Sequence, residues 1–247
     1  MKRALALLLL IGCRQETAVP APELRIAAAA SLKEPLLAAN PAFEAKHPGV
    51  KFTISFEASS TLSRQVEAAA PYDCFLSADA ANVDRLGDKV VAATRTEFLG
   101  NELVVCVRDG LAPMPASAAD LVKLSGKFAL AGEAVPVGKY ARAWLTKAGQ
   151  LDALKGKIVN AEDVRATLAL VESGAADAAV VYATDARSAK SAKLAFAAPK
   201  DEAPPVVYVA AAVTASKSPL AAEYVRWLRS ADFQQAAEKF GFKTVTP

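Results

Sequence analysis

The sequence has few of the side chains on which metal sites and nucleophilic enzymes depend. Its 247 residues include one histidine, three cysteines and two methionines. No C-x-x-C pair or Cys/His cluster occurs, so no protein metal site is predicted. The single histidine, His47, lies in the turn-like segment K-H-P-G, and no G-x-S-x-G motif is present. An extracytoplasmic serine hydrolase, the strongest alternative among enzymes, therefore lacks both its usual base and its usual nucleophile motif.

An excess of charge of one sign is also lacking. The chain has 29 basic and 26 acidic residues, a formal charge of +3, and no polybasic run. A nucleic-acid partner is therefore not predicted. No internal stretch reaches the roughly 20 apolar residues of a membrane span. With 53% hydrophobic residues, the chain is long enough for one large domain or for two lobes with their own cores.

The N-terminus has the features of an export signal. A short basic start and an apolar run end in L-I-G-C, which resembles the bacterial lipoprotein signal. Residues 1–12 are expected to be removed, and Cys13 is expected to carry lipid. The alternative is an ordinary secretory peptide in which Cys13 is incidental. Residues 13–23 then form a tether that holds the mature chain outside the cytoplasm at a membrane.

The two remaining cysteines, Cys74 and Cys106, both lie in strand-like apolar runs. An exported pair could form a disulfide. Two buried free thiols are the favoured alternative, because buried cysteine is ordinary core and the sequence gives no distance between the two.

Residues 24–34, L-R-I-A-A-A-A-S-L-K-E, are typical of an apolar strand that turns directly into a helix. Ser31 has the spacing of an N-cap, and Glu34 completes a capping box. Taken alone, this pattern indicates only a capped helix. A helix start also leaves N–H groups unpaired and carries a partial positive charge, so such a junction could surround an anion.

A second junction follows closely. Residues 50–56 alternate as a half-buried strand, residues 57–61 connect, and residues 62–70 favour a helix. Residues 72–76 form another apolar strand. The alternation of strand and helix predicts parallel pairing in a doubly wound sheet.

Two further junctions occur in the middle of the chain. Pro136 stands at the favoured first position of a helix that follows a strand over residues 127–131. Later, Asn160 suits an N-cap, and Glu162 and Asp163 suit a first helical turn.

The strand over residues 178–182 ends at Tyr182. Ligands of open parallel sheets bind beyond the carboxyl ends of the strands, so this hydroxyl could face the same crevice. The alternative is a plain tyrosine at a strand edge. The strand over residues 103–107 precedes a change of pattern that indicates entry into a second lobe, and residues 206–213 could return the chain to the first.

Six segments resemble the bacterial molybdate-binding proteins of ABC transporters, over residues 24 to about 242. They are A-A-A-S-L (28–32), S-F-E-A-S-S-T-L-S-R-Q (55–65), D-C-F-L-S-A-D (73–79), V-P-V-G-K-Y-A (135–141), A-E-D-V-R-A-T-L-A-L-V-E (161–172) and V-V-Y-A-T-D-A (180–186). The resemblance implies an α/β, two-lobed periplasmic binding protein of type II. Each lobe would be a mixed, mainly parallel sheet flanked by helices, with a hinge between the lobes. Lobe I would comprise residues 24–104 and 207–247, and lobe II residues 105–206.

The resemblance also implies a set of neutral ligands for a tetrahedral dianion. They are the hydroxyl and N–H groups of Ser31 and Ser59, the N–H groups of Val137 and Val164, and the hydroxyl of Tyr182. Ser59 is chosen over Ser60 by counting back from Thr61, so the two remain alternatives. The sequence departs from the family pattern at Glu57-Ala58 and at Val137, where alanine is common. A backbone donor tolerates such a change of side chain.

The implied protein performs no chemistry and has no cofactor. Molybdenum would be held only as its oxyanion, without a direct bond from protein to metal, and tungstate would bind as well. Partners would be an ABC permease and, through Cys13, a membrane, with the protein itself a monomer. Phosphate is expected to be rejected, because it carries a proton that needs an acceptor and the ligand atoms are mostly donors. Sulfate or another anion remains the alternative ligand.

Overall fold

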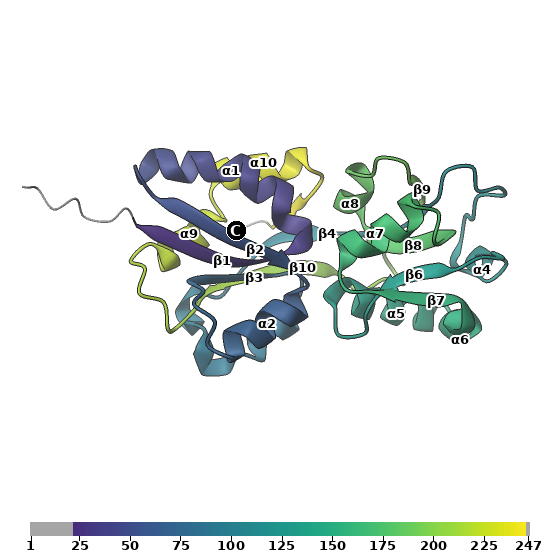
Figure 1. Ribbon diagram of the computed structural model, residues 1–247, viewed down its shortest axis with the longest axis horizontal. Coiled ribbons are helices and arrows are strands. Elements are labelled where there is room, and N and C mark those ends of the chain that lie inside the picture. Colours follow the sequence, from purple (N-terminus) through teal and green to yellow (C-terminus); the bar gives the residue numbers. More distant parts are fainter. Residues whose placement is uncertain (1–21, 246–247) are drawn as a thin grey trace, which may run out of the picture.

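The computed structural model describes residues 22–245 and has two lobes, each built around one β-sheet (Figure 1). The expected signal segment and Cys13 lie outside the described residues. Among the helices of residues 22–245, none combines the length and the apolar character needed to cross a membrane.

The first lobe contains a six-stranded mixed sheet. Across the sheet its strands are β2 (Lys51–Glu57), β1 (Glu23–Ala29), β3 (Cys74–Ser77), β10 (Val206–Ala212), β4 (Thr96–Asn101) and β11 (Lys243–Thr244). Strand β1 pairs in parallel with β2 and β3, and β10 is antiparallel to both β3 and β4. The parallel part arises, as expected, from alternating strands and helices.

Helices cover both faces of this sheet (Figure 1). One face carries α1 (Lys33–Lys46), α9 (Ala221–Trp227) and α10 (Ala231–Lys239), and the other carries α2 (Ser59–Glu67) and α3 (Ala80–Asp84). The first face buries Phe43, Tyr224 and Phe233, and the second buries Leu62 and Val83. Each face therefore has its own apolar core, which fixes the sheet between two helical layers.

The second lobe contains a five-stranded mixed sheet. Its order is β7 (Ile158–Ala161), β6 (Phe128–Ala131), β8 (Ala178–Tyr182), β5 (Leu103–Val107) and β9 (Lys193–Ala197). Strands β7, β6 and β8 are parallel, and β5 is antiparallel to β8 and β9. Its helices are α4 (Ala118–Leu121), α5 (Pro136–Lys147), α6 (Leu151–Leu154), α7 (Val164–Glu172) and α8 (Ala183–Arg187). Helices α5 and α7 lie on opposite faces of the sheet (Figure 1).

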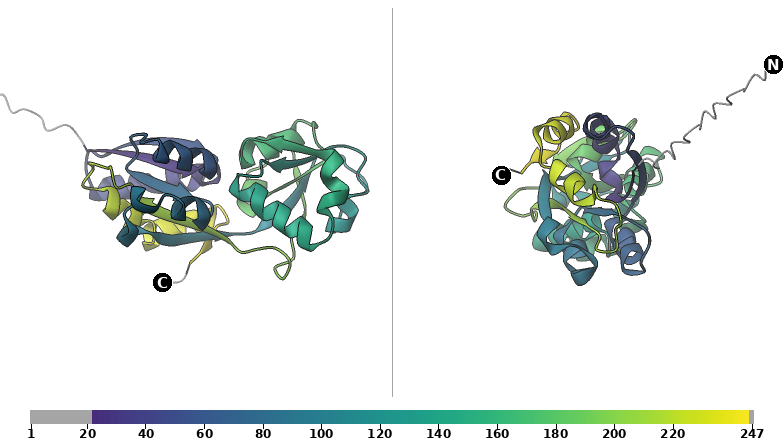
Figure 2. Two further views of the ribbon diagram at one scale, coloured as in Figure 1. Left: turned by 90° about the horizontal axis from the view of Figure 1, so that it is seen from below. Right: turned by 90° about the vertical axis from the view of Figure 1, so that its left-hand side faces the viewer.

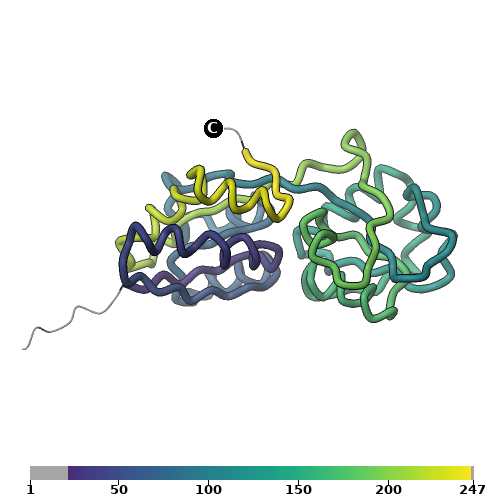
Figure 3. The backbone as a smooth tube through the Cα atoms, turned by 90° about the horizontal axis from the view of Figure 1, so that it is seen from above, coloured from purple at the N-terminus to yellow at the C-terminus, as the bar shows by residue number. Residues whose placement is uncertain are grey.

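The chain crosses between the two sheets twice (Figures 2 and 3). It leaves the first at Glu102, between β4 and β5, and returns between β9 and β10. The boundary expected after residue 104 falls inside β5, which pairs only within the second sheet. The two crossings, Glu102 and residues 198–205, lie side by side and together connect the lobes.

The structure corrects one local expectation, decides another, and adds elements for which there was none. The helix expected from residue 62 begins at Ser59, so Ser59 and Ser60 occupy its first turn. Strands β4, β9 and β11 and helices α6 and α8 had no sequence prediction. Cys74 and Cys106 are free buried thiols in different sheets, which decides the open alternative against a disulfide.

Candidate functional site

A small cavity of about 20 Å³ lies between the lobes, at the carboxyl ends of the parallel strands. Space of this size suits a compact ion in direct contact with the walls rather than an organic solute. All five residues expected to bind the anion line it: Ser31, Ser59, Val137, Val164 and Tyr182. The structure thus brings together residues spread over 150 positions of the sequence, two from the first lobe and three from the second.

Ser31 is buried in the short 3₁₀ turn η1 (Ala30–Leu32), between β1 and α1. The expected cap is wrong, because η1 intervenes and Leu32 precedes α1 without a side-chain capping bond. The Ser31 hydroxyl instead lies 2.8 Å from the hydroxyl of Tyr208, in β10. Glu34 does not complete a capping box either, since its carboxylate pairs with Arg165 of the second lobe.

Ser59 is the first residue of α2 and is almost fully buried. Its hydroxyl oxygen accepts a hydrogen bond from the N–H of Ala78 at 3.0 Å. A hydroxyl that accepts from the protein keeps its own proton for a ligand. Ser60 is also buried but does not line the cavity, so the geometry favours Ser59 of the two alternatives.

Val137 is the second residue of α5, after Pro136, as the sequence predicted. No side chain caps this helix, and proline has no N–H, so Val137 presents the first backbone donor of the helix. Gly138 lets the helix start approach the end of β6, because a Cβ atom there would lie 2.2 Å from the carbonyl oxygen of Gly132. The close approach accompanies the placement of Val137 in the cavity wall.

Val164 begins α7, but the expected N-cap is wrong. Asp163 caps the helix by accepting from the N–H of Ala166 at 2.8 Å. Asn160 lies in β7, where its side-chain oxygen accepts from Arg142 at 2.6 Å. Because the Asp163 side chain bonds the N–H of Ala166, three residues further on, the N–H of Val164 remains one of the unpaired donors of the first turn.

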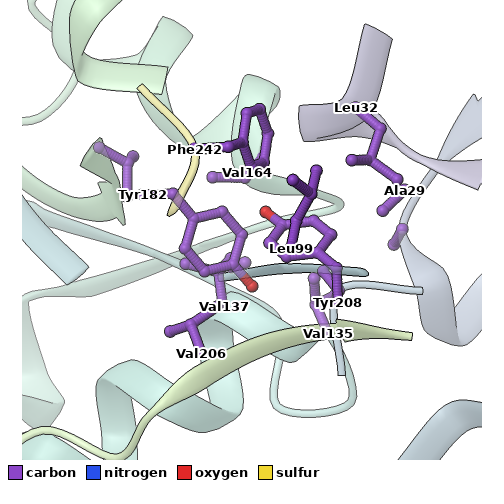
Figure 4. Packing of buried hydrophobic residues seen from close by; sticks show 14 of the residues in the cluster. Ala29, Leu32, Leu99, Val135, Val137, Val164, Tyr182, Val206, Tyr208 and Phe242 are labelled. Carbon is purple, nitrogen blue, oxygen red and sulfur yellow. The ribbon is translucent and has the colours of Figure 1, made fainter. Parts of the chain in front are cut away.

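Tyr182 ends β8, and its hydroxyl is buried without a hydrogen-bond partner in the described part of the chain. Burial raises the pKa of this phenol well above its usual value, so it remains protonated and able to donate. Its ring lies 5.9 Å from that of Tyr208, and the two phenols are neighbours (Figure 4). A buried hydroxyl without a hydrogen-bond acceptor costs free energy, and a ligand oxygen bound in the cavity would remove that cost.

The cavity wall holds no lysine, arginine or histidine. Two carboxylates, Glu57 and Asp163, belong to the wall, but their oxygens accept from Gln65 and Ala166 respectively. Helix starts, hydroxyls and N–H groups therefore supply its positive potential. Such a wall can surround an anion with donors without a counter-charge.

Ion pairs that were not predicted from the sequence join the lobes beside the cavity. Glu34 of α1 pairs with Arg165 of α7, and Asp79 lies 3.5 Å from the ammonium group of Lys139 in α5. In both pairs the carboxylate belongs to the first lobe and the cation to the second. The lobes are thus held together by complementary charge around a site whose wall lacks cations.

Asp185, in α8, is fully buried beneath Arg165. Its carboxylate lies 3.0 Å from the Nε of Arg165, but neither oxygen has a hydrogen bond of good geometry. Burial raises the pKa of Asp185 to about 7, and the charges of Glu34 and Asp163 add to this rise while Arg165 opposes it. Arg165 therefore divides its charge between one carboxylate of each lobe.

His47 lies away from the cavity. It is the C-cap residue that follows α1 and stacks on Phe43, with 4.3 Å between the ring centroids. Its Nε2 lies 3.2 Å from a carboxylate oxygen of Glu223. The serines of the cavity therefore do not lie next to His47, and the Ser–His pair expected of a serine hydrolase is not formed.

Known proteins share both the sequence and the fold. The model of the family described as bacterial extracellular solute-binding protein matches residues 24–243. The molybdate-binding protein ModA of Escherichia coli (strain K12) is 36% identical over 210 residues, 80% of each chain. YvgL of Bacillus subtilis (strain 168), provisionally named an ABC transporter substrate-binding lipoprotein, is 34% identical over 246 residues, covering 96% of this chain and 94% of YvgL.

A solved structure supports the fold in particular. The periplasmic molybdate-binding protein of Azotobacter vinelandii matches with a TM-score of 0.79 at 23% identity, over 91% of this chain and 99% of that one. The two-lobed architecture of periplasmic binding proteins, expected from the sequence, is thereby confirmed. With a family match over nearly its whole length and two relatives above 30% identity, the chain belongs to the bacterial extracellular solute-binding protein family.

Proposed function

We propose that this protein captures molybdate between its lobes and delivers it to an ABC importer. One observation carries the proposal: Ser31, Ser59, Val137, Val164 and Tyr182 converge on one small cavity whose wall has donors and no cation. Relatives named for molybdate binding support the choice of ligand.

Desolvation explains why the donors must be so many. A buried dianion is very costly unless its oxygens are all hydrogen-bonded, and preorganised N–H and O–H groups meet that need. Tungstate, an anion of the same shape and charge, is expected to bind alongside molybdate. Phosphate at neutral pH carries a proton that requires an acceptor, whereas the ligand groups proposed for Ser31, Ser59, Val137, Val164 and Tyr182 are donors.

The family and the N-terminal sequence support a location outside the cytoplasm. We propose that the mature chain works outside the cytoplasm as a monomer, tethered by lipid on Cys13. The L-I-G-C sequence and the lipoprotein name of YvgL support the tether. Replacing Cys13 by serine should release the protein from the membrane fraction, and unchanged fractionation would argue against the anchor.

Titration calorimetry of the purified mature chain tests the ligand. Molybdate and tungstate should each bind one per chain, with sulfate weaker and phosphate weakest. Equal affinity for phosphate and molybdate would overturn the donor argument, and the absence of molybdate binding would overturn the proposed function.

A further inference from the structure

The hydroxyl of Tyr208 links the ligand cavity to the crossing between the lobes. It lies 2.8 Å from the Ser31 hydroxyl on one side and 3.4 Å from the amide nitrogen of Asn101 on the other. Tyr208 itself is not part of the cavity wall. We propose that Tyr208, oriented by Asn101, is a positioning residue that turns the Ser31 proton toward the ligand and so excludes protonated oxyanions. The proposal rests on the proposed function.

The direction of this chain of hydrogen bonds follows from Asn101. Its side-chain oxygen accepts from the backbone N–H of Glu102 at 2.9 Å, so its NH₂ group must face the other way. That group donates to the hydroxyl of Thr184 at 2.9 Å and to that of Tyr208. Since the Tyr208 oxygen accepts a hydrogen bond from Asn101, its own O–H is left to donate to Ser31.

Ser31 is thereby fixed as a donor toward the cavity. Its oxygen accepts from Tyr208, and its single proton is free for an anion. Burial keeps the pKa of Tyr208 raised, so this donor persists at every physiological pH. Ser59 is set in the same sense by the N–H of Ala78. Both serines are then oriented as donors, which disfavours a hydrogen bond from the proton of a hydrogen phosphate to either serine oxygen.

The rest of Tyr208 is held by packing that a phenylalanine would keep. Its ring is fully buried and lies edge-on against Phe98 at 6.4 Å and Phe242 at 5.4 Å. Tyr208→Phe therefore removes the hydroxyl alone and lets the Ser31 hydroxyl rotate. Tyr224→Phe is the matched control, because Tyr224 is also fully buried in the first lobe and has one hydrogen bond, to Asn40 at 2.8 Å, away from the cavity.

Calorimetric titration with molybdate, alone and in competition with inorganic phosphate, tests the proposal on the whole mature chain. Loss of one neutral hydrogen bond should weaken molybdate binding by Tyr208→Phe about two- to tenfold. The inhibition constant of phosphate for Tyr208→Phe, corrected for the variant's own molybdate affinity, should fall. The preference of this variant for molybdate over phosphate should therefore drop by about tenfold or more. Tyr224→Phe should keep the wild-type selectivity.

A second variant guards against a folding defect. Asn101→Ala leaves the Tyr208 hydroxyl without its orienting donor and should lower selectivity in the same direction but less. The inference is overturned if the selectivity of Tyr208→Phe stays within twofold of wild type, or if phosphate competes with molybdate in neither protein. In both cases the proposed function stands as long as the wild-type protein binds molybdate. Absence of molybdate binding by wild type overturns both.

Discussion

Replacing Tyr182 by phenylalanine should make the protein more stable and its binding of molybdate weaker. The hydroxyl of Tyr182 is buried at the cavity and has no partner within residues 22–245. Phenylalanine keeps the ring, which packs beside Tyr208. The substitution therefore removes one polar atom that costs free energy in the unliganded protein and that is expected to donate to the anion.

The two effects can be given magnitudes. A buried hydroxyl without a partner costs about 1–3 kcal/mol, so its removal should raise the free energy of unfolding by up to that amount. For a chain of this length, each kcal/mol corresponds to roughly 2–4 °C in Tm. A hydrogen bond to a charged group contributes about 1.5–3 kcal/mol, so its loss should weaken molybdate binding about 10- to 150-fold.

Thermal unfolding with and without molybdate, together with calorimetric titration, measures both quantities. Tyr224→Phe again serves as the control, because its hydroxyl has a partner in Asn40. That variant should lose stability and keep its affinity, the opposite pattern on both readouts. An unchanged Kd for Tyr182→Phe would refute the ligand role of Tyr182, and a lower Tm would show that its hydroxyl already has a partner in the free protein.

Three further predictions concern the surroundings of the cavity. Glu34→Gln should weaken molybdate binding no more than about fivefold, since its pair with Arg165 is partly exposed, and titration at high salt should abolish the difference. The folded-state pKa of Asp185 is raised from 3.8 to about 7, so its contribution to stability is present below about pH 4 and lost as the pH rises through 7. The free energy of unfolding, measured with urea, should therefore fall across this pH range in the wild type and fall less in Asp185→Asn. Gly138→Ala should lower both Tm and molybdate affinity, because the new Cβ would meet a backbone carbonyl at 2.2 Å, whereas Gly156→Ala has open space and should change neither.

Local patterns predicted those features of the fold and site that local chemistry determines. The strands at residues 103–107 and 178–182 have the bounds read from their apolar runs, and Pro136 begins its helix as its fixed backbone angle requires. The five expected ligand residues came from a family resemblance, and they share one cavity. Their roles as ligands remain predictions.

What the sequence did not indicate depends on contacts between distant residues. Ser31 meets Tyr208 across 177 positions, and Glu34 meets Arg165 across 131. The S-x-x-E spacing predicted a capping box. In the structure Ser31 lies in the turn η1, before the helix start, and the Glu34 carboxylate pairs with Arg165 of the other lobe. At the other misjudged cap, the short strand β7 extends through Asn160, so the helix begins later, at Val164.

The path of the chain between the sheets has a consequence for biogenesis. The five-stranded sheet is made from one uninterrupted segment between β5 and β9, whereas the six-stranded sheet needs β10, synthesised afterwards, to join β3 with β4. The second lobe can therefore form its sheet without the rest of the chain. The first lobe cannot complete its sheet until β10 has been synthesised, and its formation closes a long loop. The six-stranded sheet is therefore the last part of the fold to be completed as the chain is synthesised.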